Sequence, residues 1–356
     1  MLWQLLRGSG YGYGSIEDNP HQEAARAADN LPLDPIEVAG CADLKALKTK
    51  AIGCFFVEAA LLLILCVSSF TGQMMQGVTR PERTYVNPRY DQHFKELERA
   101  GILKRCRADR LKFCSGYFAV PKKGRWARAI FNGKRLSERF KCPPPTNIPD
   151  ICAVIRKIDQ LNQETGNNGF SVVTGDFRHF FHQIKLSPEI SKFFGLTLGN
   201  SKQRSRVFRP RSYEWTTLPM GWSYSPVIAQ AIAWRTISHA EEGEEKHICI
   251  DGMSSSPMFV PVNSEGKTVG FAVVYYDNYL IVSTCPRIAE ELNRRILRNA
   301  KLFKIAIKEH EYFSRKDLIQ SWEAQRKMEQ PSKSRTLIFL GVVMALAPKR
   351  TLQVEN

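Results

Sequence analysis

Two stretches decide the fold of this chain: residues 171–184 read SVVTGDFRHFFHQI, and residues 271–282 read FAVVYYDNYLIV. Each places one aspartate, Asp176 or Asp277, after an apolar run rich in β-branched and aromatic residues, a composition that favours a β-strand. A carboxylate beside a strand is costly to bury unless it is paired or binds a cation. Two such carboxylates, brought together from separate strands, form a cradle for two Mg²⁺ ions. The sequence therefore predicts a metal site on a β-sheet.

The composition is that of a basic globular protein. The chain of 356 residues has 51 lysines and arginines against 35 aspartates and glutamates, a net charge of +16. This excess favours a polyanionic partner, nucleic acid or an anionic membrane face, and the alternative is a basic protein with neither. Nine cysteines include no Cys-x-x-Cys pair, which argues against a zinc ribbon or a disulfide scaffold. Reduced thiols indicate an intracellular protein, cytoplasmic or nuclear.

Periodicity and turn residues organise the rest of the chain. Residues 1–45 are rich in Gly, Ala and Asp, and we expect them to be largely disordered. The acidic and then Ser-rich segment 241–270 is expected to be an insertion. The remaining predictions are helices at 91–103, 148–163, 226–240 and 288–302, a hairpin at 115–131, and strands at 193–198, 206–218 and 336–344.

The order of these sequence blocks resembles that of a retroelement reverse transcriptase, over about residues 94–343. Either aspartate alone could be a strand-end or turn residue, but the blocks together are specific. The matching blocks are 118–123 (FAVPKK) with Arg128 for the basic fingers segment, 176–184 for Asp-x-x-x-x-aromatic-x-x-Ile, 218–226 (LPMGWSYSP) for Leu-Pro-x-Gly-x-x-x-Ser-Pro, 275–278 (YYDN) for Tyr-x-Asp-Asp, and 339–341 (FLG) for the primer grip.

The resemblance implies an α+β fold: a right-hand polymerase palm, made of an antiparallel sheet with helices, plus fingers. The implied domains are a partly disordered, poorly ordered N-terminal region, fingers, a palm that includes the insertion, and a tail, at residues 1–90, 91–170, 171–345 and 346–356. The implied activity is RNA-directed DNA polymerisation, which transfers nucleotides from dNTPs to a primer 3′-hydroxyl on an RNA or DNA template. Two Mg²⁺ ions would assist it, with Mn²⁺ as a possible substitute.

The resemblance also assigns roles residue by residue. Asp176 and Asp277 would bind metal with the Phe177 carbonyl and the Asn278 oxygen, and Lys308 would be a general acid for pyrophosphate. Phe181 would be a steric gate against the ribose 2′-hydroxyl, and its alternative is a core phenylalanine. The implied dNTP-binding residues are Lys122, Lys123, Arg128, Phe177, Phe181, Met220 and Gly221, the alternative for the three basic residues being a solvated hairpin face. The implied primer and template residues are Tyr275, Tyr276, Phe339, Leu340 and Gly341.

Two departures from the family pattern affect this interpretation. Asn278 stands where the family has its second aspartate, which removes one negative charge but keeps an oxygen ligand. This variant resembles tyrosine-recombinase retrotransposons of the DIRS/VIPER kind. The chain also ends soon after residue 341, so we expect a truncated copy without a thumb, and other parts of a polyprotein, such as a ribonuclease H or a recombinase, would be partners.

Two rival hypotheses remain. A catalytically inactive remnant would bind nucleic acid through the same basic surface. A membrane-tethered protein is the second, because residues 51–70 (AIGCFFVEAALLLILCVSSF) are long and apolar enough to span a bilayer despite Glu58. The alternative for this segment is a buried helix. Lysines that precede it would keep residues 1–50 cytoplasmic and place a polymerase on the wrong side of the membrane, which favours the buried helix.

Overall fold

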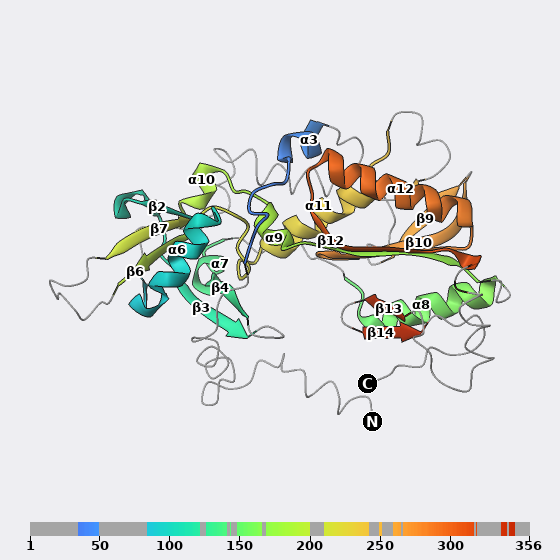
Figure 1. The fold of residues 1–356 in the computed structure, drawn as a ribbon, viewed down its shortest axis with the longest axis horizontal. Coiled ribbons are helices and arrows are strands. Elements are labelled where there is room, and N and C mark those ends of the chain that lie inside the picture. Colours follow the sequence, from blue (N-terminus) through green and yellow to red (C-terminus); the bar gives the residue numbers. More distant parts are fainter. Residues whose placement is uncertain are drawn as a thin grey trace, which may run out of the picture.

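A computed structural model of the protein shows two bodies, a palm built on one sheet and fingers built on another (Figure 1). It describes residues 35–49, 84–121, 126–140, 143, 148–165, 169–199, 210–241, 249–250, 259–264, 266–316, 318, 336–339 and 342–345.

The palm sheet has six strands in the order β12-β5-β11-β10-β9-β8, and all its pairs are antiparallel. The two stretches singled out in the sequence are neighbours in it, because β11 pairs with β5 and faces Asn278 to Asp176. The strands are β5 (Ser171–Phe177), β8 (Cys249–Ile250), β9 (Val260–Ser264), β10 (Lys267–Tyr275), β11 (Asn278–Ser283) and β12 (Ile307–Phe313).

Helices cover both faces of the palm sheet (Figure 1). Alternate strand residues point to opposite faces, so Val173 and Tyr279 pack with α11 (Ser225–Ser238) and α12 (Pro286–Leu302). Val172 and Leu280 pack instead on α8 (Ile151–Glu164) across the other face. Each fully buried apolar side chain in these layers contributes about 1.5–3 kcal/mol. The sheet that carries the two aspartates is therefore held from both sides.

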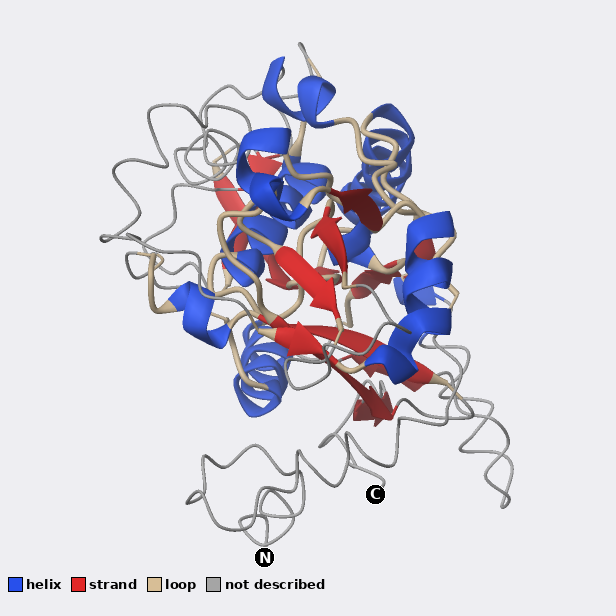
Figure 2. Cartoon of the chain, turned by 90° about the vertical axis from the view of Figure 1, so that its left-hand side faces the viewer, coloured by secondary structure: helices blue, strands red, loops and turns tan. Residues whose placement is uncertain are grey.

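The fingers contain a four-stranded sheet, in the order β1-β6-β7-β2, and a separate hairpin, β3–β4. Figure 2 looks onto these strands, with helices on either side. The strands are β1 (Tyr85–Val86), β2 (Leu103–Cys106), β3 (Gly116–Pro121), β4 (Ala127–Asn132), β6 (Gly195–Leu198) and β7 (Arg211–Trp215), and the short helices nearby are η1 (Pro88–Tyr90), η2 (Ala108–Arg110), α7 (Lys134–Ser137), α9 (Phe180–Gln183) and α10 (Pro188–Ser191).

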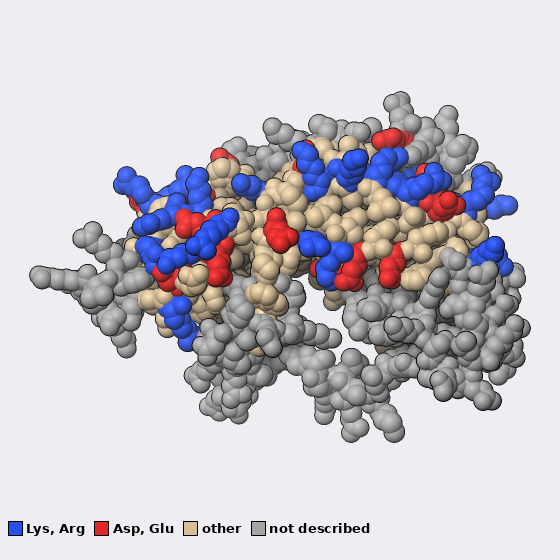
Figure 3. Space-filling model, in the orientation of Figure 1, with Lys and Arg blue, Asp and Glu red and all other residues tan. Residues whose placement is uncertain are grey.

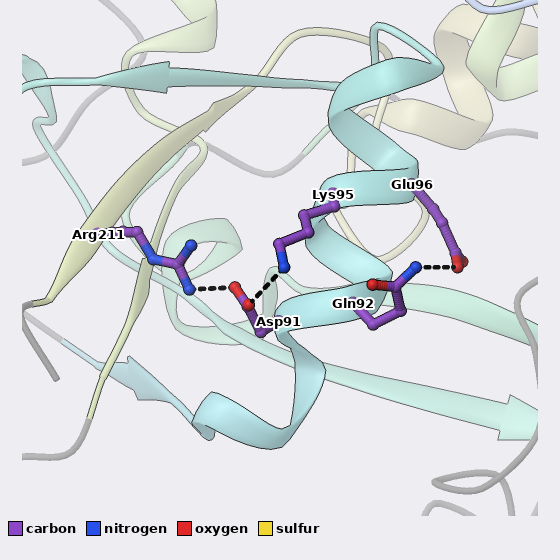
Figure 4. Close-up of polar contacts among 5 residues, drawn as sticks. All are labelled: Asp91, Gln92, Lys95, Glu96 and Arg211. Atoms are coloured by element: carbon purple, nitrogen blue, oxygen red, sulfur yellow. Dashed lines mark hydrogen bonds and ion pairs between the residues drawn. The ribbon is translucent and has the colours of Figure 1, made fainter. Parts of the chain in front are cut away.

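Helix α6 (Asp91–Arg99) packs on the fingers sheet through Phe94 and Leu97, which are buried. Its first residue, Asp91, forms an ion pair with Arg211 of β7 and a second with Lys95, one turn along the helix (Figure 4). An aspartate in the first turn also suits the helix dipole. The helix ends at Ala100, and Gly101 follows with a φ of 76°, a conformation that favours glycine.

Residues 35–45, which belong to the stretch 1–45 predicted to be largely disordered, are packed in the structure together with the helix that follows. Helix α3 (Leu44–Thr49) buries Leu47 completely. The backbone N–H groups of Gly40 and Ala42 donate hydrogen bonds to the carbonyls of His182 and Gln183 in α9. This part of the N-terminal region is therefore packed against the palm.

The sheets divide the chain differently from the predicted boundaries. Helix α8 packs on the palm although residues 151–164 were assigned to the fingers, while β6 and β7 belong to the fingers sheet although they were assigned to the palm. The expected insertion at 241–270 supplies β8, β9 and the start of β10, which extend the palm sheet.

Two strand predictions also need correction. The expected strand at 336–344 is a hairpin of two strands, β13 (Thr336–Phe339) and β14 (Val342–Ala345). Strand β12 was not predicted, because its sequence IKEHEYF mixes charged and apolar residues without a clear alternation. Residues 51–70 lie outside the described part of the chain, and among the described helices none is long and apolar enough to cross a membrane.

Candidate active site

Asp277 lies in the tight turn of a β-hairpin. Tyr275 of β10 pairs with Asn278 of β11, so Tyr276 and Asp277 form the whole turn. Tyr276 has a φ of 55°, which is unfavourable for a bulky side chain and persists only where neighbours hold it. Gln230 of α11 supplies that hold: its Oε1 accepts the Tyr276 N–H at 2.8 Å, and its Nε2 donates to the Val274 carbonyl at 2.7 Å.

Asp176 lies beside this turn on the neighbouring strand. It faces Asn278 across the β5–β11 ladder, and the Phe177 N–H donates to the Asp277 carbonyl at 2.9 Å. Burial raises the pKa of Asp277 to about 6, and repulsion from the Asp176 carboxylate adds to the increase. The fold therefore brings the two predicted carboxylates close enough to repel each other.

Two side chains partly offset the charge on Asp277. The Asn278 Nδ2 donates a hydrogen bond to the Asp277 Oδ1 at 3.1 Å, which lowers the pKa of Asp277. Arg128, exposed on β4 of the fingers, lowers the same pKa by its positive charge. The fingers hairpin thus presents a cation toward the carboxylate pair, and the role of Arg128 in holding a triphosphate stays a prediction.

Lys308 is the cation nearest to Asp176 among the described ion pairs. Its Nζ lies 3.0 Å from Asp176 Oδ2 and 2.9 Å from Glu309 Oε1. Lys308 donates both of these hydrogen bonds, and they raise its pKa, the one to Glu309 more than the one to Asp176. The β12–β5 register shifts between Ile307 and Glu309, so Lys308 sits at a bulge, a feature that commonly redirects a side chain beside an active site.

The ligand set matches a hard divalent cation with few protein ligands. In the described residues, no three His, Cys, Asp or Glu side chains converge as a metal cluster. Two carboxylates remain, one of them with a raised pKa, and an ammonium group already contacts the other. Mg²⁺ keeps several waters and needs only one or two carboxylates plus substrate phosphates, so Asp176 and Asp277 suit it.

Three aromatic residues lie close together around the turn. Phe181 of α9 is half-buried, and its ring centroid lies 6.4 Å from that of Tyr276. The ring packs partly on the core, so the gate and core interpretations are both compatible with its position. The Tyr275 and Tyr276 rings stack edge to face with centroids 5.0 Å apart.

Gly221 contacts protein backbone rather than open space. A Cβ at this residue, whose φ is 116°, would lie 2.1 Å from the Phe131 carbonyl oxygen of β4. A Cβ on Gly133 would in turn lie 2.5 Å from the Gly221 carbonyl oxygen. The glycine was predicted to allow a nucleotide or template to approach. In the structure it lets the palm loop and the end of the fingers hairpin meet.

Several predicted site residues cannot be placed. Lys122, Lys123, Leu340 and Gly341 lie outside the described residues, and only the backbone of Phe339 is described, at the end of β13. Met220 is half-buried, and the carbonyl of Phe177 remains a predicted ligand. The roles of these residues stay predictions.

Two glutamines of the site were missed by sequence reasoning. Gln230 interrupts the apolar run VIAQAIA of a predicted helix, and a lone polar residue in such a run is a signal for a buried hydrogen bond. Gln183, fully buried, donates to the carbonyls of Arg178 and Ala306 at 2.6 and 2.9 Å and accepts the Ala306 N–H at 2.8 Å. It anchors the chain just before β12, which carries Lys308.

Positive charge gathers on the fingers and along α12 (Figure 3). An open groove of about 450 Å³ on the fingers is lined by Lys104, Arg105, Cys106, Arg107, Asp109 and Arg110. Arg110 forms an ion pair with the buried Glu214 at 2.7 Å, and Arg107 forms one with Asp109 at 3.0 Å, so part of the charge is neutralised locally. A basic surface of this kind suits a phosphate backbone.

A pair of carboxylates beside a hairpin turn, on an antiparallel sheet flanked by helices and facing a basic hairpin, defines the palm and fingers of a template-directed polymerase. A family model described as reverse transcriptase (RNA-dependent DNA polymerase) matches residues 120–342. The chain belongs to this family, whose members are nucleotidyltransferases that generally use divalent metals. A search of curated proteins gives no match.

A solved structure with a similar fold is that of a foamy viral protease–reverse transcriptase in complex with double-stranded DNA. It is 12% identical, with a TM-score of 0.44, and the match covers 94% of this chain and 48% of that chain. The chain thus spans about half the length of that protein. The DIRS/VIPER subtype is not distinguished by these matches and stays a prediction.

Proposed function

We propose that this chain extends a primer on a nucleic-acid template, using dNTPs and two divalent cations held by Asp176 and Asp277. The observation that carries the proposal is that β5 and the β10–β11 turn place these carboxylates beside each other, where burial, and next the charge of Asp176, raises the pKa of Asp277 to about 6. Like charges held together in a partly buried turn are unfavourable without a cation. A site that needs a cation and faces a basic hairpin suits nucleotide triphosphates.

The other residues have roles that follow from their chemistry. Mg²⁺ bound to the carboxylates would activate the primer hydroxyl and neutralise the triphosphate. Arg128 holds phosphate oxygens by charge-assisted hydrogen bonds. Lys308 carries an ammonium group at neutral pH and, once released from Asp176, can donate a proton to the pyrophosphate leaving group. Phe181 excludes a ribose 2′-hydroxyl, and the basic fingers surface holds the template–primer without reading its sequence.

The first experiment measures dNTP incorporation by the full chain on an RNA template with a DNA primer, with Mg²⁺ and with Mn²⁺. Asp277→Ala and Asp176→Ala are tested beside it, and Glu98→Ala, an exposed acidic residue of α6 away from the basic groove, is the control. Loss of extension in the first two variants and not in the control supports the proposal. Extension retained by either site variant would rule out the metal assignment.

A second function is favoured by the polar contacts of the site. Asn278 removes one carboxylate, and Lys308 already neutralises Asp176. A chain in this state could bind nucleic acid without catalysis, through the basic fingers surface. Folded protein that binds a template–primer duplex but extends it with neither metal would identify this function.

The remaining expectations are also proposals. Other parts of a polyprotein, such as a ribonuclease H or a recombinase, would act with this chain. An intracellular site of action, cytoplasmic or nuclear, follows from its nucleic-acid substrate. Membrane association would depend on residues 51–70, and a fragment covering residues 1–90 that stays soluble without detergent would argue against it.

A further inference from the structure

One cross-strand row of the palm sheet contains a side chain that spans two strands. Gly175 of β5 pairs with Tyr279 of β11 on one side and with His310 of β12 on the other. The Tyr279 hydroxyl reaches His310 Nδ1 at 2.6 Å. It does so by passing over Gly175, where a Cβ would lie 2.2 Å from the hydroxyl oxygen. The missing side chain of Gly175 is therefore what makes room for this contact.

Helix α12 completes the bridge. The His310 Nε2 lies 2.7 Å from the Asn293 Oδ1, which can only accept a hydrogen bond. The imidazole therefore carries its hydrogen on Nε2, and its Nδ1 accepts from the Tyr279 hydroxyl. Burial lowers the pKa of His310, which favours this neutral form. Burial likewise raises the pKa of Tyr279, which keeps its hydroxyl protonated.

The bridge lies one residue away from the catalytic row. Asp176, Asn278 and Glu309 are each the sequence neighbour of a member of the Gly175 row and so point to the opposite face of the sheet. Strand β12 needs such a tie, because it is the edge strand and carries the bulge at Lys308. Among the described strands, β5 alone pairs with it, and that ladder shifts register at the bulge.

We propose that Tyr279, His310 and Asn293 are positioning residues that fix β12, and with it Lys308, relative to Asp176. The three side chains come from β11, β12 and α12, so the bridge ties the strand of Asn278 to the strand of Lys308 across β5. It touches no substrate. Its effect on catalysis rests on the proposed function, whereas its effect on β12 does not.

The experiment compares Tyr279→Phe, which keeps the ring over Gly175 and removes only the hydroxyl, with Tyr85→Phe, an exposed tyrosine of β1 in the fingers. Single-nucleotide incorporation is followed on a template–primer, and hydrogen–deuterium exchange of the β12 amides is followed in the metal-free chain. We expect the maximal rate to fall about tenfold in Tyr279→Phe with the KM for dNTP unchanged, because a small displacement of a catalytic group has this scale of effect. Exchange in β12 should be faster in this variant and unchanged in the control.

A pair of His310 variants separates positioning from simple packing. His310→Gln keeps both an acceptor and a donor and should recover most of the rate, whereas His310→Leu should match Tyr279→Phe. The double variant Tyr279→Phe with His310→Leu should be no slower than either single one. A normal rate in Tyr279→Phe, additive losses, or unchanged β12 exchange would overturn the proposal. A wild-type chain that incorporates nothing overturns the proposed function and the catalytic part of the bridge, while exchange still reports whether the bridge holds β12.

Discussion

Replacement of Asp277 by asparagine should stabilise the metal-free protein while abolishing its activity. Its carboxyl has a pKa of about 6 in the folded chain against an ordinary value of 3.8. The folded state therefore binds more protons than the unfolded state between these values, and its stability falls as the pH rises through this window. Above about pH 6 the carboxyl is ionised in the folded chain, and the increase in its pKa then lowers the free energy of unfolding by up to about 3 kcal/mol.

The increase in the free energy of unfolding caused by Asp277→Asn should follow this pH dependence. At about pH 8 the free energy of unfolding should rise by up to about 3 kcal/mol, and at about pH 5 by roughly half as much, because Asp277 is then mostly protonated in the folded chain. Urea unfolding with a chelator present measures both values. Asp109→Asn, in which an aspartate with a 65% exposed side chain is changed, should show no such gain.

Divalent metal should make the wild-type chain more stable than Asp277→Asn. Mg²⁺ binds the ionised carboxylates of the folded state, so it should stabilise the wild-type chain by mass action and leave Asp277→Asn unchanged. Equal stability of wild type and variant at pH 8 in chelator would refute the reasoning, as would a gain that does not change with pH. Either result would mean that the Asp277 carboxylate is not held in an unfavourable charged state.

Other substitutions test the neighbouring residues. Phe181→Ala should admit ribonucleotides, and unchanged sugar discrimination in a competition assay would leave Phe181 as a core residue only. Asn278→Asp should lower the Mg²⁺ concentration for half-maximal incorporation and leave the rate equal or higher; a large loss of rate would show that the hydrogen bond to Asp277 is needed. Gln230→Glu should lose the donor to the Val274 carbonyl and lower the free energy of unfolding by about 1–3 kcal/mol. A variant as stable as wild type would show that Gln230 does not hold the turn. Gly221→Ala should separate the palm loop from the end of the fingers hairpin, and limited proteolysis would detect this as faster cleavage.

The catalytic strands were predictable because their signals are local. The apolar runs around Asp176 and Asp277 define the two central strands, and the helices at 226–240 and 288–302 show their periodicity in the sequence. The edge strand β12 was not predictable, since it is stabilised by its partner β5 and by side chains from other elements. Its contribution to the site depends on contacts that no local pattern encodes.

The domain boundaries failed for a related reason. The chain passes from the fingers to the palm and back, so β6 and β7, which follow β5 of the palm in the sequence, belong to the fingers sheet. Burial of Ala42 in the Gly-, Ala- and Asp-rich stretch of residues 1–45 likewise depends on a distant surface. The role of Gly221 was predicted as a need for space, but only the structure shows that the Phe131 carbonyl occupies that space.

The passage of Tyr279 over Gly175 constrains the order in which this sequence can change. A side chain at residue 175 would overlap the tyrosine ring, so almost any substitution there is harmful while Tyr279 is present. Even if residue 279 becomes small, a Cβ at residue 175 would still lie 2.7 Å from the Glu309 carbonyl oxygen, so glycine remains necessary there. Residue 279 can therefore change while residue 175 cannot, and related sequences are expected to vary at 279 before they vary at 175.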